Sequence, residues 1–232
     1  MTHDFLKPLR LAVASFCWLA SSALSAASLH AELVDEQGQP LRDALLTLRG
    51  PLADDAVQQT AVMDQVTRQF NPRVLAVRTG TAVTFPNSDN IRHHVYSFSP
   101  VKRFELRLYQ GTPSEPVIFD KPGVVVLGCN IHDWMVGYVY VTDDSWFAVA
   151  DEQGKVAFDA LPAGRYAASL WHPQVPDLLP QPAGEVQVGT AVGTTEVRQR
   201  FVVALRVAPA PTLSEPSSAF GDAFKKALDA TQ

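Results

Sequence analysis

The pattern of apolar and polar positions predicts an all-β protein. Short runs rich in β-branched and aromatic residues recur, and Gly, Pro, Asn and Asp interrupt them. No long stretch shows a sustained 3.6-residue apolar period before the C-terminal end. We predict strands at 29–34, 45–49, 74–78, 82–85, 94–98, 117–119, 124–127, 136–141, 155–158, 166–171, 185–188 and 196–207. Many short strands separated by turn signals are typical of a β-sandwich.

The N-terminus has the features of an export signal. Lys7 and Arg10 precede an apolar run over 11–24, and small residues follow it. This order is typical of a cleaved secretory signal, and we predict cleavage after Ala26 or Ala27 and a periplasmic location. The alternative is a retained membrane anchor. After signal removal, no remaining apolar run is long enough for a transmembrane span.

Composition and cysteine content narrow the class further. The 232 residues are 47% apolar with a formal net charge of −5, which disfavours disorder and a nucleic-acid binder. Cys17 lies in the predicted signal, so Cys129 is the single cysteine of the mature chain and no internal disulfide is expected. A lone thiol in an oxidising compartment requires protection.

Cys129 belongs to a group of residues with metal-ligating chemistry. His132 and Met135 follow it at three-residue intervals, between two predicted strands, and His93 and His94 lie upstream. Two His, one Cys and a distant axial Met describe a type 1 copper site. Structural zinc is disfavoured because it rarely accepts a thioether, although Met135 alone could be a core residue. Adjacent residues on a strand point to opposite faces, so only one upstream histidine should bind.

Residues 60–142 resemble cupredoxins of the plastocyanin and amicyanin group. The resemblance rests on Phe85-x-Asn87 with a histidine six residues after the Asn, on Pro122-Gly123, and on a short Cys-x-x-His-x-x-Met loop. His94 stands where family members often have an Asn that ties the ligand loops together. The resemblance favours His93 over His94 and implies one type 1 copper ion. The implied ligands are His93, Cys129, His132 and Met135.

By the same resemblance, the protein is expected to carry single electrons rather than to be an enzyme. The expected partners are periplasmic redox proteins, with a quinoprotein dehydrogenase or a c-type cytochrome as candidates. Lys/Arg and Asp/Glu balance at eight against eight over residues 60–145, which favours docking through an apolar face that could include Trp134. Three alternatives remain: copper trafficking without redox turnover, a copper enzyme that binds small ligands, and a metal-free binding module.

The flanking segments resemble a different sandwich. Residues 31–48 and 151–173 resemble the two halves of carboxypeptidase-regulatory-like (transthyretin-like) domains. We therefore predict a signal peptide (1–27), a split sandwich (28–50 plus 146–207), an inserted cupredoxin domain (51–145), and a Pro-rich tail with a short amphipathic helix (208–232). The alternative is two β-domains in series, with 28–50 forming only an edge hairpin.

Overall fold

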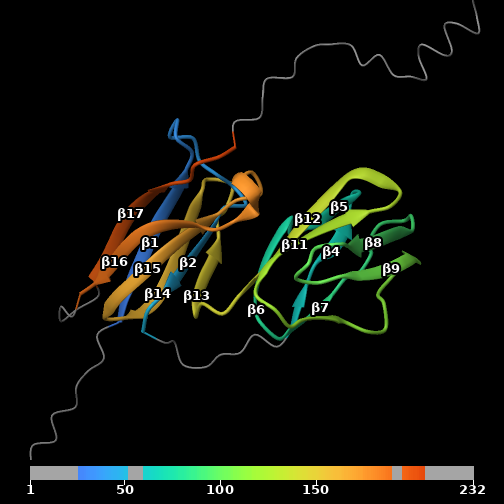
Figure 1. Cartoon of the computed structure of the whole chain (residues 1–232), viewed down its shortest axis with the longest axis horizontal. Helices are drawn as coiled ribbons and strands as arrows, with labels where there is room; N and C mark the ends of the chain where they lie inside the picture. The colour runs from blue at the N-terminus through green and yellow to red at the C-terminus, as the bar shows by residue number, and fades with distance from the viewer. Residues whose placement is uncertain (1–25, 52–59, 190–194, 207–232) are drawn as a thin grey trace, which may run out of the picture.

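The computed structural model describes residues 26–51, 60–189 and 195–206, which fold almost entirely into β-strands (Figure 1). The prediction of an all-β protein is confirmed. The strands are β1 (Ala26–Val34), β2 (Leu45–Arg49), β3 (Thr60–Val62), β4 (Asp64–Val66), β5 (Gln69–Asn71), β6 (Val74–Arg78), β7 (Thr81–Thr84), β8 (His93–Ser97), β9 (Phe104–Tyr109), β10 (Val117–Phe119), β11 (Gly123–Cys129), β12 (His132–Thr142), β13 (Trp146–Val149), β14 (Lys155–Pro162), β15 (Gly164–Trp171), β16 (Gln181–Val188) and β17 (Thr195–Val202). Within the described ranges, the single helical element is a 3-10 turn, η1 (Pro176–Leu178), and no helix is long and apolar enough to cross a membrane.

Each strand expected from the sequence has a counterpart in the structure, but the last one was predicted too long. β17 ends at Val202, and beyond it the backbone of Ala204 bonds to the side chain of Gln181 rather than to the backbone of another strand. Strands β3, β4, β5, β9 and β13 were not expected. The predicted C-terminal helix and all but the last two residues of the predicted signal lie outside the described residues.

Residues 60–142, which we call the central lobe, form a sandwich with a hairpin beside it. The larger sheet has the strand order β6-β12-β11-β8-β9, the smaller one has the order β10-β7-β3, and β4 pairs with β5. The two sheets contribute side chains to one apolar cluster, which contains Val83, Phe119 and Leu127. Burial alternates along β8 and β11, because successive strand side chains point to opposite faces.

Residues 26–51 and 146–206, which we call the flanking lobe, form two further sheets. Their strand orders are β14-β1-β17 and β13-β2-β15-β16. Strands from both ends of the described chain therefore share sheets, and β1 runs antiparallel to β14 and parallel to β17. The core of this lobe contains Tyr166 and Trp171, which are fully buried.

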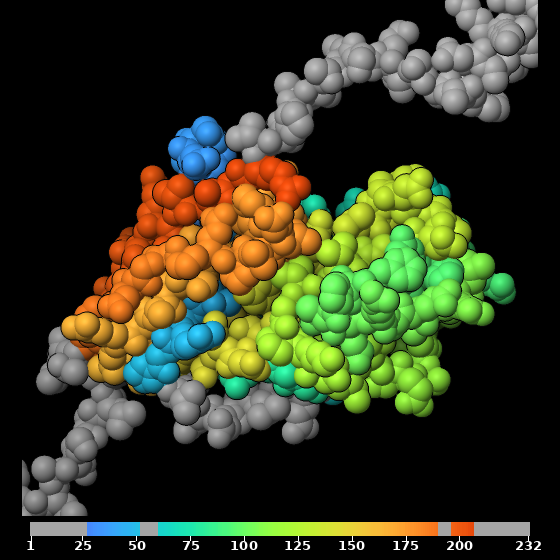
Figure 2. All heavy atoms as spheres, viewed as in Figure 1, coloured from blue at the N-terminus to red at the C-terminus, as the bar shows by residue number. Residues whose placement is uncertain are grey.

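The two lobes pack against each other, as the space-filling view shows (Figures 1 and 2). The rings of Tyr138 and Tyr140 on β12 lie 5.7 and 5.5 Å from the ring of Trp171, measured between centroids. An ion pair of 2.8 Å joins Arg49, at the end of β2, to Asp144, which lies between β12 and β13. The Arg49 side chain is exposed, so this pair adds little stability, and the aromatic contact is the larger contribution to the interface.

Candidate metal centre

A tight hairpin positions Cys129 and His132. These residues end β11 and begin β12, and they face each other as a cross-strand pair across the two residues Asn130 and Ile131. Burial alternates along β11 so that Val125, Leu127 and Cys129 all point into the core. The hairpin therefore places the Cys129 sulfur close to the imidazole of His132, with the Sγ and Nδ1 atoms 3.6 Å apart.

His93 reaches the same sulfur from the neighbouring strand. Cys129 pairs with Val95 of β8, and His93 lies two residues before Val95 on the same buried face. The His93 ring is completely buried, and its Nδ1 atom lies 3.7 Å from the Cys129 Sγ. Three potential ligand atoms, from His93, Cys129 and His132, thus lie within 4.8 Å of one another.

His94 points to the other side of the sheet. Its Nε2 atom lies 2.9 Å from a carboxylate oxygen of Glu105, and its ring meets the edge of Tyr96. The main chain of His94 nevertheless joins the two ligand segments, because the Asn130 N–H donates to its carbonyl oxygen at 3.1 Å. The backbone of His94 therefore ties the segment that carries His93 to the hairpin that carries Cys129 and His132.

The donor spacing fits one trigonal metal ion. Nitrogen and sulfur donors bound at about 2.0 and 2.3 Å lie about 3.7 Å apart when the bond angle is near the trigonal value of about 120°. The observed separations are 3.7 and 3.6 Å. A thiol has one hydrogen to donate, so it satisfies only one of two converging imidazole nitrogens. One deprotonated sulfur and two neutral imidazoles around an ion satisfy all three groups.

Met135 lies three residues beyond His132 on β12. It is 1% exposed and belongs to the same apolar cluster as Cys129 and Leu127. A thioether in such surroundings fills core volume as easily as it binds a soft metal. Met135 and Cys129 thus belong to the same core, and the role of Met135 as an axial ligand remains a prediction.

An acidic residue that the sequence did not single out holds His93 in place. Asp89 Oδ2 lies 2.8 Å from the His93 Nε2. The same carboxylate accepts backbone hydrogen bonds from Thr67, at 2.7 Å, and from Arg68, at 2.8 Å. Asn87 shapes this segment, since its side-chain amide donates to the Ile91 carbonyl and its side-chain oxygen accepts from the Asp89 N–H. A carboxylate four residues before a histidine in a polar turn was the available sequence signal.

The electrostatics of the site favour an ionised Asp89 and a neutral His132. Burial alone would raise the pKa of Asp89, but hydrogen bonds from Arg68, His93 and Thr67 outweigh it and lower that pKa. Burial, together with the proximity of His93 and Arg68, lowers the pKa of His132. A neutral imidazole is the form that binds metal ions.

Two exposed apolar residues lie within two positions of His132 in the chain. Trp134 is 67% exposed and Ile131 is 47% exposed. The Trp134 and His132 rings lie 5.2 Å apart between centroids. His132 itself is partly exposed, so this imidazole reaches from the buried sulfur towards an apolar surface.

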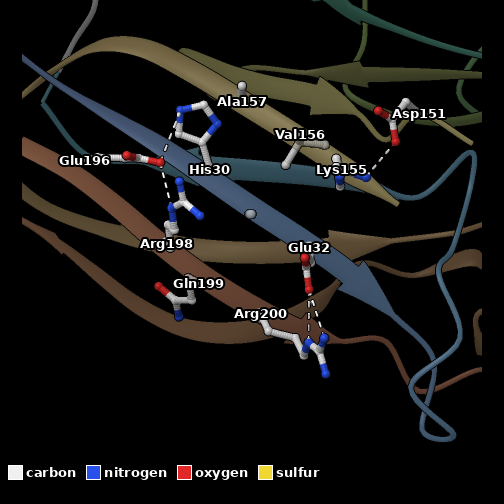
Figure 3. A pocket seen from close by; sticks show the side chains of 11 residues that line it. His30, Glu32, Asp151, Lys155, Val156, Ala157, Glu196, Arg198, Gln199 and Arg200 are labelled. Carbon is white, nitrogen blue, oxygen red and sulfur yellow. Dashed lines mark hydrogen bonds and ion pairs between the residues drawn. The ribbon is translucent and has the colours of Figure 1, made fainter. Parts of the chain in front are cut away.

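One hollow lies on the flanking lobe, away from the candidate metal site (Figure 3). It has a volume of about 570 Å³ and lies over β1, β14 and β17. Four of its charged side chains form two pairs, Arg200 with Glu32 at 2.9 Å and Arg198 with Glu196 at 2.7 Å. None of the His93, Cys129 and His132 ligand atoms lines it.

Part of this chain is similar to several solved structures. No family model matches the chain, and no curated protein matches it. Among solved structures, it is similar to a copper-containing nitrite reductase from Thermus scotoductus SA-01, with 26% identity over 40% of this chain and 25% of that chain and a TM-score of 0.35. An oxidised amicyanin variant matches with 21% identity over 42% of this chain and 98% of that chain, with a TM-score of 0.33. A purple cupredoxin from Nitrosopumilus maritimus matches with 22% identity, over 36% of this chain and 98% of that chain, with a TM-score of 0.32.

Proposed function

We propose that this protein is a type 1 copper protein that carries single electrons between redox partners. The observation that supports this most directly is the convergence of two imidazole nitrogens on one buried cysteine sulfur, at 3.7 and 3.6 Å. The set of two His and one Cys with a nearby Met is typical of such sites, whereas zinc sites rarely include a thioether. The proposed ligands are His93, Cys129, His132 and Met135.

Three of the proposed ligands, Cys129, His93 and His132, would supply the sulfur and nitrogen donors in this scheme. Copper bound there would supply one-electron chemistry by alternating between its +1 and +2 states. Cys129 would offer a thiolate. This residue is 3% exposed, so its sulfur is shielded from solvent and from other thiols. His93 and His132 would offer neutral nitrogens, and the short hairpin and the paired strands hold these donors at fixed spacing. A site that changes little between two charge states favours rapid electron transfer.

The partly exposed His132 is the proposed route for electrons. The exposed Trp134 ring lies beside it and the exposed Ile131 precedes it in the chain, and aromatic residues are enriched at protein interfaces. The balance of charge over residues 60–145 favours a partner that docks by this surface rather than by long-range attraction. We propose periplasmic redox proteins as partners, with a quinoprotein dehydrogenase or a c-type cytochrome as candidates, and export through a cleaved signal at residues 1–27.

We also propose that the cupredoxin-like domain, 51–145, is inserted into the split sandwich of 28–50 and 146–207. The sharing of sheets by β1, β14 and β17, and by β2, β13 and β15, supports this arrangement over two domains in series. The transthyretin-like character of the split sandwich remains a prediction from the sequence.

The test is the visible spectrum of the purified protein after loading with Cu(II). We expect an intense blue absorption that disappears on reduction and returns on oxidation. Cys129→Ser should abolish this absorption and leave the far-UV circular dichroism spectrum of the β fold unchanged. His93→Gln should also lose the colour, because it removes one of the converging nitrogens.

His94→Gln is the matched control, because His94 is adjacent in sequence but faces Glu105 on the other side of the sheet. This variant should keep the blue colour. Retention of colour in Cys129→Ser would contradict the proposed site, and loss of colour in His94→Gln but not in His93→Gln would reverse the assignment. Copper binding without reversible oxidation would instead favour a copper-trafficking role.

A further inference from the structure

The contact between Asp89 and His93 determines which nitrogen of His93 is free. An ionised carboxylate has acceptor atoms only, so the His93 Nε2, 2.8 Å away, must carry the hydrogen and donate it. The neutral ring then has its lone pair on Nδ1, and Nδ1 is the atom that lies 3.7 Å from the Cys129 sulfur. Asp89 thus selects the tautomer that a metal ion next to Cys129 requires.

Asp89 is itself fixed by the β4–β5 hairpin. The turn residues Thr67 and Arg68 have φ angles of 53° and 59°, in the left-handed region, and both backbone N–H groups point at the Asp89 carboxylate. The carboxylate therefore accepts three hydrogen bonds, two from this turn and one from His93. Its side chain is 13% exposed, which limits the screening of its charge by water.

We propose that Asp89 is a positioning residue of the metal centre, which sets the His93 tautomer and, through its negative charge, favours the more highly charged Cu(II) state. This inference rests on the proposed function for its copper-dependent part. Outer partners of metal-binding histidines orient the ring and raise its basicity, and their removal typically weakens metal binding about 10- to 100-fold. A negative charge next to the ligand stabilises Cu(II) more than Cu(I).

Asp89→Asn tests this role, because the amide has the same shape but lacks the charge and places a donor against one of the facing N–H groups. We expect Cu(II) affinity to fall about 10- to 100-fold while Cu(I) affinity falls less. The reduction potential, measured by spectroelectrochemical titration, should therefore shift to a more positive value. Asp89→Glu retains the carboxylate and should restore part of both properties.

Asp64→Asn is the matched control. Asp64 binds the same segment through the Ser88 hydroxyl, at 2.7 Å, and the Ser88 backbone N–H, at 3.2 Å, rather than through a histidine. We expect its copper affinity and potential to stay close to those of the wild type. Equal effects of Asp64→Asn and Asp89→Asn would overturn the proposal, because they would reveal a general loosening of the turn.

A measurement on the metal-free protein separates this inference from the proposed function. ¹⁵N NMR of histidine-labelled wild-type protein should show His93 protonated at Nε2 and unprotonated at Nδ1, and Asp89→Asn should weaken this preference. A wild-type spectrum with the proton on Nδ1 would refute the role of Asp89, whether or not copper binds. Failure of the wild type to bind copper, with the Nε2 proton in place, would refute the proposed function and leave the positioning role intact. A copper-binding wild type whose potential is unchanged in Asp89→Asn would refute the electrostatic part.

Discussion

Gly137 is a position in the central lobe at which one added methyl group should disturb the core packing. This residue lies on β12, two residues after Met135, and the buried ring of Phe70 on β5 covers it. A Cβ atom at position 137 would lie 2.8 Å from two ring carbons of Phe70, and 2.9 Å from its Cβ. Carbon atoms in contact prefer separations of about 3.5–4.0 Å, so the methyl group cannot be accommodated without movement.

The magnitude follows from what can move. The Phe70 Cβ is tied to the backbone of a short hairpin, and its ring is 3% exposed, so rotation of the side chain relieves only part of the clash. Extra atoms in a well-packed core typically cost about 1–3 kcal/mol. We expect Gly137→Ala to lower the free energy of unfolding of the metal-free protein by this amount, as measured by urea denaturation. Copper affinity should also fall, because the displaced hairpin includes the turn that binds Asp89.

Gly189→Ala is the control, since a Cβ at position 189 meets nothing within 4 Å, and surface changes of this kind stay within about 0.5 kcal/mol. A double-mutant cycle with Phe70→Ala isolates the clash. That change removes two of the three crowded atoms, so Gly137→Ala should cost less in its background than in the wild type. Equal stability of Gly137→Ala and Gly189→Ala, or additive costs in the cycle, would refute this account of the packing.

Two further predictions concern buried side chains. Burial lowers the pKa of His172, and its Nδ1 accepts a hydrogen bond from the Gln174 N–H. In the unfolded chain, His172 takes up a proton near pH ~6.5, whereas the folded state binds this proton only at lower pH. The contribution of His172 to the free energy of unfolding is therefore fully present above this pH and is lost below it. The loss is at most about 1.4 kcal/mol per pH unit for one proton. His172→Asn keeps an acceptor for Gln174 and should flatten part of that fall in urea titrations between about pH 7.5 and 5, whereas an unchanged pH dependence would exclude His172 as a contributor. Met135→Leu nearly conserves volume and should cost the metal-free protein less than about 1.5 kcal/mol, while the copper spectrum and potential change; an unaltered spectrum would make Met135 a core residue only.

Local sequence patterns predicted the parts of the site that depend on near neighbours. The spacing of Cys129, His132 and Met135 is a property of one hairpin, and strand alternation separates His93 from His94 once the register is known. Asp89 was not predicted, because its partners at 67–68 lie in a hairpin whose strands are three residues long. Strands of that length show no measurable period, and nothing local indicates that their turn lies against a segment about 20 residues away.

The strand pairings of the flanking lobe depend still less on local sequence. The composition of β1 indicates a strand, but not that β14 and β17 are its two neighbours. The parallel pair β1 and β17 joins residues such as Glu32 and Arg200, which are 168 positions apart. Only the packing of the complete chain brings such segments together.

That parallel pair has a consequence for the order in which the molecule forms. Of the described strands, β1 is the first along the chain and β17 is the last, so all the other described strands lie between these two partners. Closing so distant a contact carries a larger entropic cost than closing the short hairpins of residues 60–142. The ligand-bearing hairpins are therefore expected to assemble early, and the β14-β1-β17 sheet to be completed last. A chain truncated before residue 195 would leave one edge of β1 unpaired and prone to self-association.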